Sequence, residues 1–239
     1  MSKLSNRSVP SAVSKVNRPA VLPSTEIVFL LDRSGSMSNN DKWVEAVLGI
    51  NALVADQTKL AGDAFLTLVV FDRLAKEPII QIVHDHVPLK DVPELDPKGP
   101  IQPRSETPLW DAIYATIQHV RGKRAAMPAT QRPKLVALNI FTDGLNNAST
   151  EITGSKGIAL LRKMIAECEA EGWQVSFAGA GGGDIFAQAA EIGINLVVAV
   201  AGTARGVEDS MSQTTSHIGN YRKSHGISGG SSGGKKKPN

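Results

Sequence analysis

Stretches of consecutive apolar residues alternate along this chain with stretches in which apolar residues recur every three or four positions. The first kind is typical of strands buried on both faces of a sheet, and the second of helices with one buried face. The predicted strands cover residues 26–32, 64–71, 78–83, 135–141, 175–178 and 194–200, and the predicted helices cover 41–59, 109–120, 158–168, 185–191 and 207–218. This alternation predicts an α/β fold with three layers around a doubly wound, mostly parallel sheet.

Two of the predicted strands follow each other without a helix between them. A short polar turn separates residues 64–71 from residues 78–83, which predicts a hairpin and places one antiparallel strand at the sheet edge. Residues 84–106 are rich in proline and show no period, so we expect a long loop there. Loops of this length in a compact domain are usually functional or mobile.

The chain has 239 residues, of which 41% are hydrophobic, enough for one core but too few for two well-packed domains. We expect one domain at residues 25–221, flanked by disordered tails at 1–24 and 222–239. A single cysteine, Cys168, excludes an internal disulfide and favours a reducing compartment. No apolar run approaches the roughly 20 residues of a membrane span. We therefore expect a cytoplasmic protein, or a virion-associated one if a phage encodes it.

The net charge of +3 and the pI near 9.0 suggest nucleic-acid binding only until the charges are placed along the chain. Residues 1–24 carry +4 and residues 222–239 carry +5, whereas residues 25–221 hold 17 basic and 23 acidic residues, a net charge of −6. Neither tail has aromatic residues among its basic ones. We therefore expect no nucleic-acid partner, and tails that are able to contact an acidic surface.

Polar side chains follow two of the predicted strands. Asp32, Ser34 and Ser36 come directly after the first strand, Asp143 comes after the fourth, and Thr107 lies just before the helix at 109–120. Because ligands of an open parallel sheet bind outside the carboxyl ends of the strands, these side chains are expected to meet at one edge. Two carboxylates and three hydroxyls form an all-oxygen set that suits a hard cation such as Mg²⁺. A metal held mainly by hydroxyls stays electrophilic, and a partner's carboxylate is able to complete its shell.

Asp32-x-Ser34-x-Ser36, followed by Thr107 and by Thr142-Asp143-Gly144, resembles the metal-ion-dependent adhesion site of von Willebrand factor A (vWA) domains. The resemblance covers about residues 25–221. It implies a sheet with one antiparallel edge strand, Ser34, Ser36 and Thr107 as direct ligands, and Asp32 and Asp143 as ligands directly or through water. It also implies Mg²⁺, or Mn²⁺ or Ca²⁺, and a protein partner that presents Asp or Glu. Loops around residues 84–106 and 144–156 would then determine specificity.

Residues 106–113 and the pair Phe71-Asp72 look closer to stand-alone vWA proteins of bacteria and phages, including those near tellurite-resistance operons. That resemblance implies a role in a stress-response or assembly complex. Many such domains have a small residue before the loop threonine, whereas this chain has Glu106. Its carboxylate could occupy the metal's open position or repel an acidic ligand.

Two other functions stay open at this point. A Mg²⁺-dependent phosphohydrolase also places an aspartate after the first strand, although such phosphatases normally need a second acid two residues later, where this chain has Ser34. A structural or assembly protein could fill the metal site with its own Glu106. The ordered set of residues favours a non-enzymatic interaction module with no catalytic residue.

Overall fold

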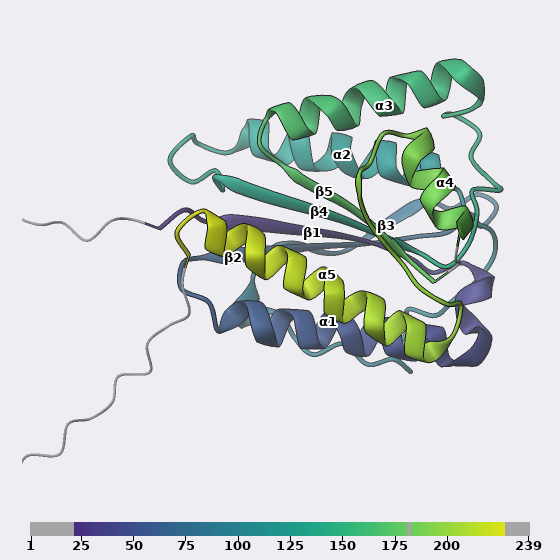
Figure 1. The fold of residues 1–239 in the computed structure, drawn as a ribbon, viewed down its shortest axis with the longest axis horizontal. Coiled ribbons are helices and arrows are strands. Elements are labelled where there is room, and N and C mark those ends of the chain that lie inside the picture. Colours follow the sequence, from purple (N-terminus) through teal and green to yellow (C-terminus); the bar gives the residue numbers. More distant parts are fainter. Residues whose placement is uncertain (1–21, 181–182, 228–239) are drawn as a thin grey trace, which may run out of the picture.

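The computed structural model describes residues 22–180 and 183–227, which form a six-stranded sheet between layers of helices (Figure 1). The strands are β1 (Thr25–Asp32), β2 (Ala64–Phe71), β3 (Ile80–Pro88), β4 (Leu135–Thr142), β5 (Gln174–Gly179) and β6 (Leu196–Ala199). They lie in the order β3-β2-β1-β4-β5-β6, and every pair is parallel except β2 with β3. This confirms the predicted doubly wound sheet with one antiparallel edge strand.

Helices cover both faces of this sheet. The helices are α1 (Lys42–Thr58), α2 (Leu109–Ala126), α3 (Gly154–Ala170), α4 (Gly183–Glu191) and α5 (Ala204–Ser224), with short 3-10 helices at η1 (Gly35–Asp41) and η2 (Leu89–Asp91). Helices α1 and α5 lie on one face, and α2 and α3 lie on the other (Figure 1). Along β1, Ile27 and Phe29 join the core on the α1 side while Val28 and Leu30 join the core on the α2 side. Burial on both faces explains the unbroken apolar run of this strand.

The edge strand β3 is longer than the sequence predicted. The prediction ended it at residue 83 and began a loop at 84, but β3 continues to Pro88. Its residues are only partly buried, so the polar run from His84 to His86 is tolerated there. The pairing with β2 shifts register between Leu66 and Val69, and His86 has a φ of 60°, which departs from regular strand geometry. An edge strand with these irregularities lacks the alternation from which strands are predicted.

The domain also extends past the boundary predicted at residue 221. Helix α5 ends at Ser224, and both Arg222 and Ile227 are fully buried. Small polar residues such as Ser210 and Thr214 lie on the buried face of α5, which weakened its apolar pattern. The rest of the predicted tails, residues 1–21 and 228–239, lies outside the described residues.

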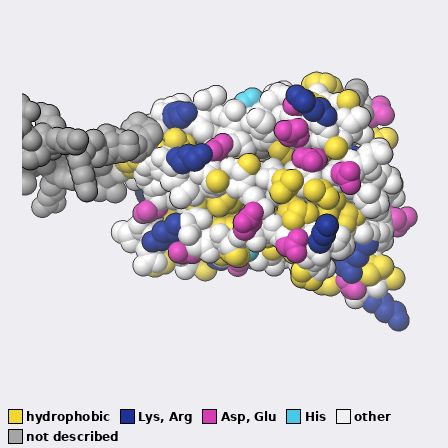
Figure 2. Space-filling model, turned by 90° about the horizontal axis from the view of Figure 1, so that it is seen from below, with side chains coloured by type: hydrophobic (Ala, Val, Ile, Leu, Met, Phe, Trp, Pro, Cys, Tyr) yellow, Lys and Arg dark blue, Asp and Glu magenta, His cyan; other side chains and the backbone are white. Residues whose placement is uncertain are grey.

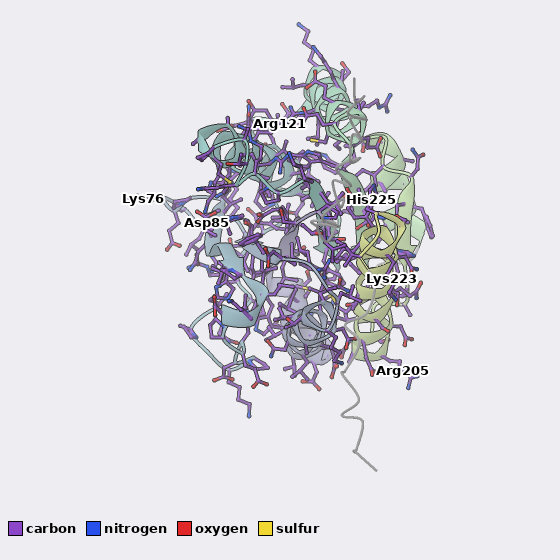
Figure 3. The ribbon with its side chains drawn as sticks, turned by 90° about the vertical axis from the view of Figure 1, so that its left-hand side faces the viewer. Lys76, Asp85, Arg121, Arg205, Lys223 and His225 are labelled. Carbon is purple, nitrogen blue, oxygen red and sulfur yellow. The ribbon has the colours of Figure 1, made fainter. Side chains whose placement is uncertain are left out.

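Both described ends of the chain lie at the same edge of the sheet, where β1 begins and α5 ends (Figure 1). They meet around Gly62. Its carbonyl accepts a hydrogen bond from Arg222, and a Cβ on this glycine would lie 3.3 Å from Cβ of Leu22. Figure 3 views this edge, with Asp85 of β3 on one side and His225 just after α5 on the other. The carboxyl ends of the parallel strands therefore form the opposite edge.

The surface over α1 and α5 carries acidic and basic side chains interspersed with hydrophobic ones, rather than a continuous basic patch (Figure 2). Within the described ranges, no helix combines the length and the apolar character that crossing a membrane requires.

Candidate metal centre

The candidate site lies where β1 and β4 end side by side. These strands are neighbours in the sheet, β1 ends at Asp32 and β4 ends at Thr142. The chain leaves β1 toward α1 on one face and leaves β4 toward α3 on the other. The loops after the two strands therefore separate, which is where an open α/β sheet has space for a ligand.

Asp32 is fully buried and joins the two strand ends. Its Oδ1 accepts a hydrogen bond from the backbone N–H of Ser34 at 2.6 Å, and its Oδ2 accepts one from Oγ1 of Thr142 at 2.6 Å. Burial raises the pKa of Asp32 to about 7, and the nearby Asp143 adds to the rise, while the hydrogen bonds from Thr142 and Ser34 oppose it. A nearby cation would favour the ionised form of this carboxyl group.

A chain of contacts continues from Ser34 to Asp143. Oγ of Ser34 lies 3.1 Å from Oγ of Ser36, and Oγ of Ser36 donates to Oδ1 of Asp143 at 2.6 Å. The other oxygen of Asp143 accepts a hydrogen bond from Nζ of Lys42. Residues 107 positions apart in the sequence are therefore in direct contact.

Thr107 reaches the same place from a third segment. A Cβ on Gly144 would lie 3.8 Å from Oγ of Ser36 and 3.9 Å from Oγ1 of Thr107. Both hydroxyls therefore border the small space that the absent side chain of residue 144 leaves. Thr107 is only 3% exposed. The predicted set thus gathers at one edge: Asp32, Ser34, Ser36, Thr107 and Asp143.

The chemistry of this set fits a hard divalent cation. All of its side-chain donors are oxygens, and Mg²⁺ and Mn²⁺ prefer oxygen ligands. In the described part of the chain, no group of three or more His, Cys, Asp or Glu residues is arranged to hold a metal ion. A cation at this edge would therefore depend on the serine and threonine hydroxyls as well as on the two carboxylates.

Backbone contacts hold the Thr107 loop against the loop after β1. The N–H of Gly35 donates to the carbonyl of Ser105 at 2.9 Å, and the N–H of Arg104 donates to the carbonyl of Arg33 at 2.7 Å. The N–H of Thr107 donates to Oδ1 of Asn147 at 2.8 Å, which ties the same loop to the segment after β4. These bonds fix the three segments relative to one another.

The buried carboxylate of Asp72 links the loop after β1 to the Thr107 loop. Nε of Arg33 and Nε of Arg104 each donate to one of its oxygens at 2.8 Å. Asp72 is fully buried, so the paired guanidinium groups supply the positive charge that a buried carboxylate needs. Asp72 positions the loop that carries Thr107.

Asp111 positions the third segment, the loop between β4 and α3. Its carboxylate accepts hydrogen bonds from the backbone N–H groups of Thr150 at 2.7 Å, Glu151 at 3.1 Å and Ile152 at 2.8 Å. The loop between β4 and α3 is therefore attached to the first turn of α2.

The prediction from sequence included neither Lys42 nor Asp111 and did not place Asp72 at the site, because their partners are distant in the chain. A signal existed for Lys42. It falls on the stripe of α1 formed with Ala46, Ile50 and Leu53, all of which are buried. A lysine on an apolar stripe indicates a buried partner for its charge.

Glu106 does not fill the site. It is exposed, and its backbone carbonyl accepts a hydrogen bond from the N–H of Arg73 at 3.1 Å. Among the described residues, no hydrogen bond or ion pair joins its carboxylate to the predicted ligands. The proposal that this chain occupies its own metal site through Glu106 therefore finds no support in the geometry.

The fold is similar to those of solved vWA structures at low sequence identity. The SpRpn10 VWA domain is 12% identical with a TM-score of 0.52, and the match covers 81% of this chain and 95% of that one. A von Willebrand factor type A protein from Catenulispora acidiphila is 15% identical with a TM-score of 0.52, covering 83% of this chain and 43% of that one. The fold of this chain is therefore vWA-like.

A mutant of the PilB minor pilin from Streptococcus sanguinis is also similar, at 11% identity and a TM-score of 0.61 over 85% of this chain. This chain spans 62% of the pilin's length. No protein-family model and no curated protein matches the sequence.

Proposed function

We propose that this chain is a divalent-metal-dependent protein-interaction module. Mg²⁺, or Mn²⁺ or Ca²⁺ in its place, would be held by Asp32, Ser34, Ser36, Thr107 and Asp143. The observation that carries the proposal is the continuous set of contacts from Thr142 through Asp32, Ser34 and Ser36 to Asp143, with the Thr107 hydroxyl beside it. Folds of the vWA type often mediate protein–protein interactions.

The donor set supports a partner that supplies a carboxylate. Three of the five proposed ligands are neutral hydroxyls, so the metal keeps much of its positive charge. A hard cation with an incomplete shell binds an additional carboxylate oxygen from Asp or Glu. Residues 104–106 of the loop after β3 and residues 144–153 after β4 lie beside this edge and would determine which partner fits. The resemblance of residues 106–113 to bacterial and phage proteins supports a cytoplasmic or virion-associated stress-response or assembly complex.

The environment of Asp32 disfavours the alternative of a phosphohydrolase. A nucleophilic aspartate must present an oxygen to its substrate. Both oxygens of Asp32 instead accept hydrogen bonds within the protein, and the residue is fully buried. Asp32 therefore suits support of a metal better than attack on phosphorus.

Calorimetric titration of the full chain with MgCl₂ and with MnCl₂ tests the metal site. Ser36→Ala should weaken binding by about tenfold or more, because it removes a ligand and the hydrogen bond to Asp143. Ser38→Ala is the matched control, since Ser38 lies in the same 3-10 helix but is exposed and donates to the carbonyl of Gly35. The absence of binding heat, or equal affinities in the two variants, would contradict the proposed site.

Two further measurements separate the functions. Incubation with p-nitrophenyl phosphate and Mg²⁺ should release no product, whereas hydrolysis that is lost in Asp32→Asn would support the phosphohydrolase.

Affinity capture from the native host should retain a protein partner in Mg²⁺ and lose it in EDTA. Retention that is equal in both buffers would contradict coordination of the partner by the metal.

A further inference from the structure

Lys42 is an unusual lysine because it is buried next to the candidate metal centre. It is the first residue of α1 and is only 7% exposed, whereas lysine side chains normally keep their ammonium group in water. Its Nζ forms an ion pair with Oδ2 of Asp143, and the side chain of Asp143 is itself 0% exposed. An ammonium group is thus held inside the protein at the place where the proposed ligands converge.

The other basic side chains at this edge are engaged elsewhere. Arg33 and Arg104 both pair with Asp72, and Arg73 lies 3.7 Å from Asp111. Within residues 22–180 and 183–227, Lys42 is the basic residue that forms an ion pair with Asp143. The negative charge of Asp143 is therefore balanced by Lys42.

Asp143 has no oxygen without a protein partner. Ser36 donates to Oδ1 and Lys42 donates to Oδ2. A divalent cation that binds among these oxygens must either take Asp143 from the ammonium group or lie close to it. Both alternatives cost free energy, the first through the lost ion pair and the second through repulsion between like charges in a poorly solvated place.

We infer that Lys42 is a counter-cation built into the metal site: it neutralises Asp143 when no metal is bound, and a divalent cation must compete with it. This inference rests on the proposed metal site and adds regulation to it. Lys42 keeps the fold stable without metal and lowers the affinity for metal, so that occupancy follows the metal concentration instead of being permanent.

Titration of the full chain with MnCl₂, compared between the wild type and Lys42→Met, tests this role. Methionine resembles lysine in length but carries no charge. The variant should bind Mn²⁺ about tenfold more tightly or better, because the competing charge is gone. Lys59→Met is the matched control, since Lys59 directly follows α1 and pairs with Asp56 but is exposed. Its Mn²⁺ affinity should equal that of the wild type.

Thermal unfolding provides an independent readout. In EDTA, Lys42→Met should unfold at a lower temperature than Lys59→Met, because Asp143 loses its buried partner. Added Mn²⁺ should raise the unfolding temperature of Lys42→Met by more than that of the wild type. Should Lys42→Met not fold in EDTA, Lys42→Gln gives the same comparison, since its amide still donates to Asp143 without a charge.

The outcomes separate this inference from the proposed function. Binding of Mn²⁺ by the wild type together with equal or weaker binding by Lys42→Met and Lys42→Gln would overturn the counter-cation role and leave the metal site standing. No binding of Mn²⁺ by the wild type or by either variant would overturn the metal site and the inference together.

Discussion

The environment of Asp32 makes a negative charge costly unless a cation is near. The carboxyl group is fully buried, and its pKa rises to about 7 chiefly for that reason. The two hydrogen bonds that it accepts, from Ser34 and Thr142, only partly offset the lost hydration. A neutral amide of the same shape would avoid this cost, so an acid at this position suits a role with a bound cation.

This environment predicts an inverted dependence of stability on pH in EDTA. Unfolded Asp32 ionises near its ordinary pKa of 3.8, whereas the folded carboxyl group keeps its proton until about 7. Between these values the unfolded state binds fewer protons, so the free energy of unfolding contributed by Asp32 should fall as pH rises and level off above about 7. Urea denaturation at a series of pH values between about 4 and 8 measures this free energy of unfolding.

Asp32→Asn is the control for the pH experiment, because the amide has the same shape and does not ionise. The difference in free energy of unfolding between the wild type and this variant should change with pH as described, which removes the contributions of all other groups. If the free energy of unfolding changed with pH in parallel for the two proteins, the pKa of Asp32 in the folded protein would not be raised, and the prediction would be wrong.

The five proposed ligands could be named from the sequence because each follows a strand end or precedes a helix, and parallel strands bring such positions to one edge. Their partners could not be named in the same way. Lys42 contacts a residue 101 positions away, Asp72 contacts residues 39 and 32 positions away, and Asp111 contacts residues 39 to 41 positions away. Nothing local marks those pairs. Whether the ligands hold a metal remains a prediction.

At the scale of elements, α1 and α5 are joined by one buried arginine. Arg222 of α5 is 0% exposed and donates to the carbonyl of Gln57 at 2.7 Å and to the carbonyls of Ala61 and Gly62 at 3.4 and 3.3 Å. Burial lowers the pKa of this guanidinium, and no ion pair with an acid is found for it among the described residues. One of its acceptors, the carbonyl of Gln57, belongs to the last turn of α1, where a helix carries partial negative charge, and the other two carbonyls follow the helix.

Arg222→Met should lower the free energy of unfolding by about 3 kcal/mol, because the carbonyls after α1 lose their donors in a buried place. Chemical denaturation measures the loss. Lys223→Met is the matched control, since Lys223 is the next residue of α5 and is exposed. If both variants lost the same stability, the bond between α5 and the end of α1 would not be responsible.

The strands and helices with strong periodicity were predicted closely, and the weak ones were not. Strand β1 is buried along its whole length, so its pattern is unambiguous. Strand β3 and the end of α5 instead owe their form to partners, the first to pairing with β2 and the second to the contacts of Arg222. Such tertiary contacts leave little trace in the apolar pattern.

At the scale of the whole molecule, the sheet has one edge that carries the proposed metal ligands and an opposite edge where both described ends of the chain lie. Gly62 joins the two described ends at the latter, and its φ of +80° is one that other residues adopt with difficulty. A side chain there would also press on Leu22, whose Cβ would be 3.3 Å away. The geometry of this edge therefore depends on a residue without a side chain.

Gly62→Ala should lower the free energy of unfolding by about 1–2 kcal/mol through backbone strain and the contact with Leu22. Gly122→Ala should raise it by about 0.5–1 kcal/mol, because Gly122 lies in α2 with nothing near the added Cβ. Urea denaturation compares the two.

Neither substitution should change Mn²⁺ affinity, since both lie away from Asp32 and Asp143. A loss of affinity in Gly62→Ala would show that the two edges are coupled.

The separation of the two edges has a mechanical consequence. Tension between a partner held at Asp32 and an anchor at the N-terminal side of Leu22 would act along β1, from one end of the strand to the other. Strand β1 is bonded on one side to β2 from Thr25 to Asp32 and on the other side to β4 from Thr25 to Leu31. The two ladders would be loaded in shear, with their hydrogen bonds sharing the force, instead of being opened one after another.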